Sequence, residues 1–75
     1  MPELRNLSGN DVVKALERLG FRQARQKGSH VVMRKETSDG SFGCAVPLHK
    51  EIKIGTLKGL LKQAKVEVED FKKVI

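Results

Sequence analysis

Hydrophobic positions at helical spacing mark the first element of the chain. Its apolar side chains recur with charged residues between them, which is the pattern of a helix with one buried face. Ser8 is typical of a residue that caps the start of a helix, and Asp11 follows where it completes an acidic capping box. Gly20 is typical of the residue just past a helix end. The pattern predicts a helix over residues 9–19, with a buried stripe of Val12, Val13, Leu16 and Leu19.

Three segments with the composition of β-strands follow this helix. They are residues 21–27, 29–35 and 41–46. Gly28 separates the first two, and Asp39-Gly40 ends a turn over residues 36–40, as in a hairpin. Alternation places one apolar face on the third strand, formed by Phe42, Cys44 and Val46. Pro47, which cannot donate to a ladder, is expected to stop this strand.

The last third of the chain predicts a second helix and a short third one. Gly55-Thr56 opens the second helix, with Thr56 as its cap and a buried stripe of Leu57, Leu60, Leu61 and Ala64. Gly59 lies inside this helix, where a close approach to the sheet would explain a glycine. A short helix is expected to start near Glu69 and Asp70, with Phe71 and Val74 packed inward. The order predicts a two-layer α+β domain, in which helices cover one face of an antiparallel three-stranded sheet and leave the other open.

Length and composition limit the number of domains and the kinds of protein that this sequence can form. The chain has 75 residues and one cysteine, Cys44, which predicts a single domain over residues 1–75 with a modest core and no disulfide framework. No apolar run approaches the roughly 20 residues of a membrane span, and no signal peptide is apparent. We therefore expect a protein of the reducing cytoplasm.

Charge is concentrated in two blocks. The chain carries a formal net charge of +6, residues 22–35 contribute +5 without a single acid, and residues 50–66 contribute +4. Two separate basic blocks that can meet in space favour a polyanionic partner such as nucleic acid. The alternative is a solvated basic surface that aids solubility.

The run from Gln23 to His30 holds the strongest candidate for chemistry. His30 has an imidazole, whose unperturbed pKa of about 6.5 suits proton transfer near neutral pH. Arg25 and Lys27 place positive charge beside it, while Gly28 and Ser29 open the strand end. RNA carries its own nucleophile, so one imidazole and nearby cations suffice for strand cleavage without a metal. The alternative is a histidine with no chemical role on the strand surface.

A second basic segment follows the third strand. Lys50 and Lys53, with the amides at the start of the second helix, are a candidate phosphate site, or simply an exposed loop. His49 is a possible second proton carrier. A metal site of both histidines with Cys44 fits no common zinc spacing, so neither a metal nor a cofactor is expected. Cys44 itself is expected in the core.

Short motifs in a fixed order make the whole chain resemble the HicA toxin family, also described as YcfA-like proteins. These motifs are Leu7-Ser8-Gly9, Leu19-Gly20-Phe21, Arg25-Gln26-Lys27-Gly28-Ser29-His30, Val46-Pro47-Leu48-His49, Ile54-Gly55-Thr56-Leu57 and Glu69-Asp70-Phe71. The resemblance implies a fold like the double-stranded-RNA-binding domain and metal-independent cleavage of mRNA, which inhibits translation and growth. It places the family's histidine on His30 and implies a HicB-type antitoxin that covers the site. The chain departs from many family members in being lysine-rich from Lys50 to Lys65.

Two other functions compete with the nuclease. A non-catalytic module for double-stranded RNA would share the fold and the basic blocks, because such modules recognise shape and phosphates. An interaction module would use the open sheet face or an edge strand to bind another protein. Neither requires His30 to act on RNA, so the effect of replacing His30 on cleavage separates them from the nuclease.

Overall fold

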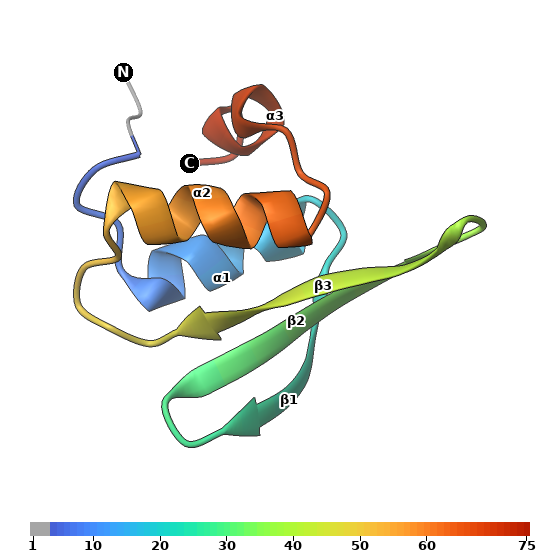
Figure 1. The fold of residues 1–75 in the computed structure, drawn as a ribbon, viewed down its shortest axis with the longest axis horizontal. Helices are drawn as coiled ribbons and strands as arrows, with labels where there is room; N and C mark the ends of the chain where they lie inside the picture. Colours follow the sequence, from blue (N-terminus) through green and yellow to red (C-terminus); the bar gives the residue numbers. More distant parts are fainter. Residues whose placement is uncertain (1–3) are drawn as a thin grey trace.

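The computed structural model describes residues 4–75 and contains six elements in the expected order. The elements are α1 (Gly9–Arg18), β1 (Arg22–Lys27), β2 (His30–Thr37), β3 (Gly40–Pro47), α2 (Ile54–Gln63) and α3 (Val68–Lys72). The strands form one antiparallel sheet in the order β1-β2-β3. Figure 1 shows the helices together on one side of the sheet, with the tip of the β2–β3 hairpin projecting beyond them. The predicted α+β fold, similar to a double-stranded-RNA-binding domain, is confirmed.

The core lies between the helices and one face of the sheet. Alternate residues of β2 and β3 point into it, because Val31 pairs with Val46 and Met33 pairs with Cys44 across the ladder. The largest fully buried side chains are Leu16, Met33, Leu57, Leu61 and Phe71, together with Val12 and Val46. The helix stripes are buried largely as predicted. Leu19, at the end of α1, is only partly buried, because it packs at the margin of the core.

The start of α1 is fixed both locally and by contact with the end of β3. The Ser8 hydroxyl accepts a hydrogen bond from the Asp11 amide at 3.1 Å, and the Asp11 carboxylate accepts one from the Ser8 amide at 3.0 Å. This is the predicted capping box. Gly9 comes next, and a Cβ there would lie 2.7 Å from the Cα of Leu48. Only glycine allows α1 to approach β3 this closely.

Two predictions for α2 were wrong. The helix begins at Ile54 with Lys53 as its cap, and no side chain caps it, so Thr56 is the third helical residue and not the cap. The backbone conformation of Lys53 starts the helix before the Gly55-Thr56 pair. The explanation offered for Gly59 was also wrong, because a Cβ there would meet nothing within 4 Å.

The strand boundaries differ from the prediction at several turns and ends. Ser29 belongs to the β1–β2 turn, β2 continues to Thr37, and β3 begins at Gly40, so the second turn is only Ser38 and Asp39. Pro47 does not stop β3 but is its last residue, paired with His30. An edge strand tolerates proline where the missing N–H would have pointed away from the sheet.

Candidate functional site

His30 is positioned by a two-residue hairpin turn. Lys27 and His30 are direct partners at the ends of β1 and β2, with Gly28 and Ser29 between them. Gly28 has a φ of +60°, whereas Ser29 is not among the residues with positive φ. Glycine at the first central position followed by a residue with negative φ is the pattern of a type II′ turn, which suits the twist of paired strands. The turn therefore holds the imidazole directly across the ladder from the lysine.

An irregularity in β1 brings three cations to the same face of the sheet. Arg25 pairs with Val32 and Lys27 with His30, but the register shifts by one residue between Gln23 and Arg25. In a regular strand Arg22 and Arg25, three residues apart, would point to opposite faces. The extra residue of the bulge reverses this relation. Arg22, Arg25 and Lys27 thus all lie on the face of the sheet that the helices leave open.

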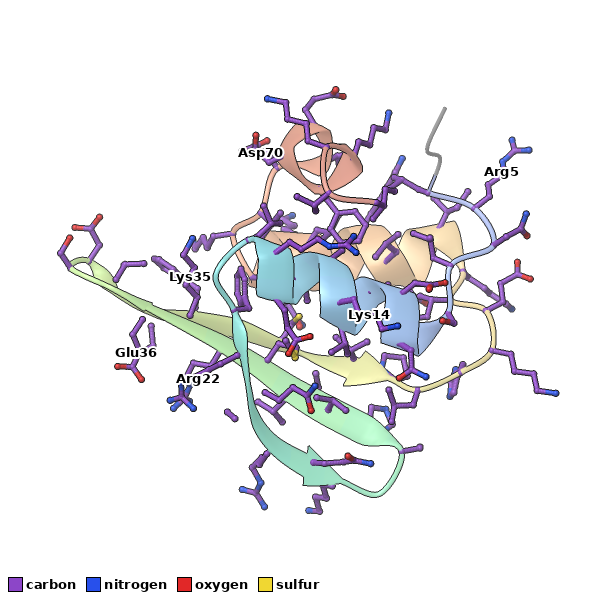
Figure 2. The ribbon with its side chains drawn as sticks, turned by 180° about the vertical axis from the view of Figure 1, so that it is seen from behind. Arg5, Lys14, Arg22, Lys35, Glu36 and Asp70 are labelled. Atoms are coloured by element: carbon purple, nitrogen blue, oxygen red, sulfur yellow. The ribbon has the colours of Figure 1, made fainter. Side chains whose placement is uncertain are left out.

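We call this surface the basic face, formed by Arg22, Arg25, Lys27, His30 and Arg34. All five side chains are exposed. Arg22 pairs with Glu36 at 3.0 Å, and both side chains remain more than half exposed. Figure 2 shows Arg22 and Glu36 together on the side of the sheet away from the helices. Among residues 4–75, no carboxylate pairs with the other four, so the charge of Arg25, Lys27 and Arg34 is available to a ligand.

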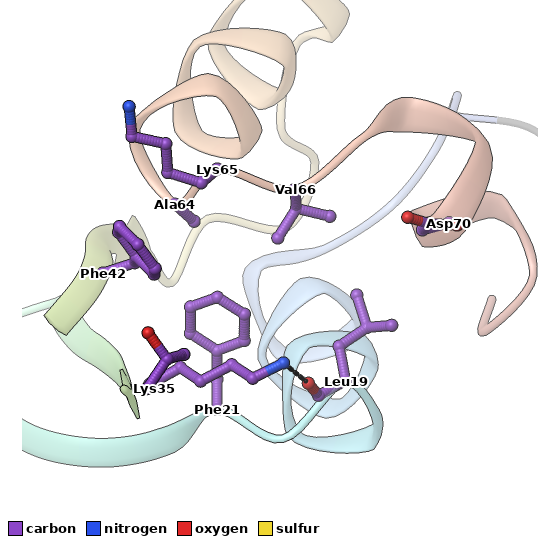
Figure 3. A pocket seen from close by; sticks show the side chains of 9 residues that line it. Leu19, Phe21, Lys35, Phe42, Ala64, Lys65, Val66 and Asp70 are labelled. Atoms are coloured by element: carbon purple, nitrogen blue, oxygen red, sulfur yellow. Dashed lines mark hydrogen bonds between the residues drawn. The ribbon is translucent and has the colours of Figure 1, made fainter. Parts of the chain in front are cut away.

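Lys35, the remaining member of the first basic block, does not belong to this face. Its ammonium donates a hydrogen bond to the carbonyl oxygen of Leu19 at 2.9 Å and lies 5.8 Å from the centre of the Phe21 ring. This lysine lines a hollow of about 200 Å³ at the ends of α1 and α2. Figure 3 shows it beside Phe21. The charge stabilises the carbonyl end of α1 and is not directed toward a ligand on the open face.

The second basic segment lies at the same end of the molecule as the turn. The amide of Leu48 donates to the carbonyl of Ser29 at 2.7 Å, and the amide of Gly9 donates to the carbonyl of His49 at 2.9 Å. The side chains of His49, Lys50 and Lys53 are exposed. They follow the last residue of β3 and are not part of the basic face, so the segment adjoins the site without sharing its surface.

Cys44 does not contribute to this site, and among residues 4–75 the carboxylate that pairs with the basic face is that of Glu36. Cys44 is buried on the helix side, and burial raises the pKa of its thiol to about 11, so the thiol remains protonated at neutral pH. Within the described part of the chain, no three side chains of His, Cys, Asp or Glu are grouped as metal ligands. The side chains exposed on the basic face are an imidazole, which can transfer a proton, and cations, which can stabilise negative charge.

Comparison with known families identifies the chain. Residues 9–66 match the family described as HicA toxin of bacterial toxin-antitoxin. The chain belongs to the HicA toxin family. The match runs from the first residue of α1 to the residues just past α2 and includes the whole sheet with His30. A search of curated proteins gave no match.

Family membership confirms the resemblance seen in the sequence and gives this HicA toxin a place in a toxin–antitoxin system with an antitoxin partner. None of its helices within residues 4–75 is both long and apolar enough to cross a bilayer.

The sequence did not single out two residues of the site. Arg22 and Arg34 were counted in the first basic block, but the structure places them on the same face as His30, as partners across the ladder. Arg34 stands four residues after His30, so alternation along one strand could have found it. Alternation could not have placed Arg22, because the bulge determines which face of the sheet its side chain occupies.

Proposed function

We propose that this HicA toxin is an endoribonuclease that cleaves mRNA without a metal ion and so inhibits translation and growth. His30 is its catalytic residue. In the proposed reaction the 2′ oxygen of RNA attacks the neighbouring phosphorus, and the bond from phosphorus to the 5′ oxygen breaks. One proton leaves the 2′ hydroxyl and one is taken up by the leaving oxygen. His30 serves as the base or the acid, and the exposed His49 is the candidate for the other role.

The pairing of Lys27 with His30 is the observation that carries this proposal. Residues directly opposite in an antiparallel pair have Cβ atoms about 5 Å apart, so one phosphate can meet the ammonium and the imidazole together. Arg25 lies on the same face and adds a second cation for the charge that develops on the phosphate. Gly28 and Ser29 hold the two strands in this register. Family membership supports the same assignment.

Lys50 and Lys53 extend the proposed contact with RNA beyond the basic face. They lie in the loop joined through Leu48 to the carbonyl of Ser29, and α2 begins there without a side-chain cap. Lysines beside free helix amides suit a phosphate. We assign them to the backbone of a nucleotide next to the cleaved one.

The proposed partner is a HicB-type antitoxin that covers His30, and the proposed compartment is the cytoplasm, where mRNA and antitoxin meet. A partner that covers the basic face would exclude RNA from it. Competition between the antitoxin and RNA is therefore part of the proposal.

The decisive experiment measures cleavage of a long single-stranded RNA in excess chelator by the wild type and by His30→Ala. We expect the wild type to cleave and His30→Ala to lose at least about 100-fold in rate, the usual contribution of a positioned acid or base. His30 is exposed, so the variant should keep its circular dichroism spectrum and melting temperature. His49→Ala tests the second proton-transfer role, and a smaller loss than that of His30→Ala would separate the two histidines. Equal cleavage by wild type and a folded His30→Ala would contradict the proposal.

One observation favours the alternative, a module that binds double-stranded RNA without cutting it. No hydrogen bond to the His30 side chain is found among residues 4–75, so no hydrogen bond within this part of the chain orients the imidazole. Tight, salt-sensitive binding of duplex RNA with no turnover would support this alternative over the nuclease.

A further inference from the structure

The two edges of the sheet differ in how they are protected. β1 is short, carries a bulge and presents Arg22, Arg25 and Lys27. β3 has eight residues without a charge and keeps an unbroken register with β2. Bulges and charges are the features that prevent an edge strand from pairing with another chain. Of the two edges, only that of β3 has neither a bulge nor a charged residue.

The free hydrogen-bonding groups of β3 follow from its ladder. The amide of Leu48 donates to the carbonyl of Ser29, and these two residues lie directly opposite each other when the register of β2 and β3 is continued. Bonded and non-bonded pairs alternate in an antiparallel ladder. The amide and carbonyl groups of Ser41, Gly43 and Ala45 therefore point away from β2. Within the described residues, none of the backbone hydrogen bonds outside the ladders and helices involves these three.

The surface beside this edge has a basic group and room for a side chain. Gly43 is the partner of Arg34, and it has no side chain to cover the arginine. A depression of about 320 Å³ lies here on the open face, lined by Val32, Arg34, Ser41, Gly43 and Ala45 among others. A strand added to β3 would place alternate side chains over this depression, within reach of the Arg34 guanidinium.

We propose that the β3 edge is the docking site for an extended strand of the antitoxin, which pairs with Ser41, Gly43 and Ala45 and directs an acidic side chain to Arg34. The inference rests on the family assignment, which supplies an antitoxin, and not on nuclease activity. It is distinct from the cover over His30, because it names a backbone interaction at the opposite edge of the sheet from β1.

Charge favours this occupant over a second copy of the chain. Each copy carries a net charge of +6. Antiparallel pairing of two β3 strands about Gly43 would bring two copies of Arg34 into one row on the same face, with no carboxylate between them. An acidic strand removes this repulsion and forms the same main-chain bonds.

Ala45→Pro tests the proposal with little disturbance to the fold. Its N–H points away from β2, so proline removes no bond of the ladder and blocks only an added strand. Ala45→Ser is the matched control that keeps the N–H. We expect Ala45→Pro to raise the Kd for the purified cognate antitoxin by about tenfold or more, and Ala45→Ser to leave it unchanged. Arg34→Glu should also weaken binding, and the loss should be smaller at high salt.

Binding is measured by biolayer interferometry, with melting temperatures and circular dichroism spectra showing that each variant is folded. Wild-type affinity in a folded Ala45→Pro would overturn the proposal. So would sedimentation showing that the isolated wild type is a dimer and Ala45→Pro a monomer, because a second copy would then occupy the edge. Neither readout uses RNA, so loss of the nuclease proposal would leave this one standing.

Discussion

Gly9 and Gly59 are both helical glycines, but their surroundings differ. A Cβ on Gly9 would press against the backbone of Pro47 and Leu48, whereas a Cβ on Gly59 would meet nothing within 4 Å. We expect Gly9→Ala to lower the free energy of unfolding by about 1–3 kcal/mol, because α1 must move away from β3. We expect Gly59→Ala to raise it by about 0.5–1 kcal/mol through helix propensity.

Urea unfolding followed by circular dichroism measures both effects, and the two variants control for each other. If both substitutions changed the free energy of unfolding equally, the close contact of Gly9 with the end of β3 would not be what makes a side chain at residue 9 destabilising. Because Gly9 also donates to the carbonyl of His49, its substitution should displace the loop that carries Lys50. Sequence alone could not show this contact, since the partners are far apart along the chain.

For single residues, the sequence could not always predict which face of the sheet a side chain occupies. His30, Lys27 and Arg25 were placed together correctly because they are close in sequence and the turn is local. Lys35 was counted with them, yet its ammonium bonds to Leu19 on the helix side. Its direction follows from the register of β2 and the position of the end of α1, which charge does not reveal.

At the scale of elements, the capping box of α1 makes a prediction about pH. The Ser8 amide and hydroxyl hold the pKa of Asp11 below its ordinary value of 3.8. A lowered carboxyl pKa stabilises the fold above the ordinary value, and the stabilisation is lost as pH falls through the folded value. We expect Asp11→Ala to cost about 0.3–1 kcal/mol at neutral pH.

Thermal unfolding of wild type and Asp11→Ala should therefore converge as the pH drops below 3.8. Asn10→Ala, exposed and outside the capping pair, is the control, with a change within about 0.5 kcal/mol at every pH. A constant gap between wild type and Asp11→Ala across the acid range would show that the carboxylate has no part in the cap.

The ends of helices and strands could be predicted where the residues that determine them are close together in the sequence. The box of Ser8 and Asp11 fixed the start of α1 from four consecutive residues. The start of α2 was placed wrongly, because Thr56 has the chemistry of a cap but the backbone turns into the helix at Lys53. Pro47 was expected to stop β3 after Val46, but it is the last residue of the strand, which its place on a sheet edge allows.

At the scale of the whole molecule, the position of charge should matter more than its amount. Arg25→Gln with Lys27→Gln lowers the net charge by two on the basic face. Lys58→Gln with Lys62→Gln makes the same change on α2, in the helix layer. The nuclease proposal expects only the first pair to weaken binding of single-stranded RNA.

Filter binding over a range of salt concentrations measures the difference. Each lost phosphate contact should reduce the slope of log K against log salt by about 0.7. The slope of the first double variant should fall by about 1.4, and that of the second should stay at the wild-type value. Equal effects of the two pairs would mean that net charge attracts RNA without a defined face.

The bulge in β1 has a consequence for how this sequence can change length. Arg22 shares a face with Arg25 only because the register shifts between Gln23 and Arg25. Removing Ala24, the extra residue of the bulge, would straighten the strand but leave Arg22 and Arg25 two residues apart, so they would still share a face. Descendants of this sequence should therefore tolerate the loss of Ala24 more readily than the loss of Gln26, which would place Lys27 on the opposite face from Arg25.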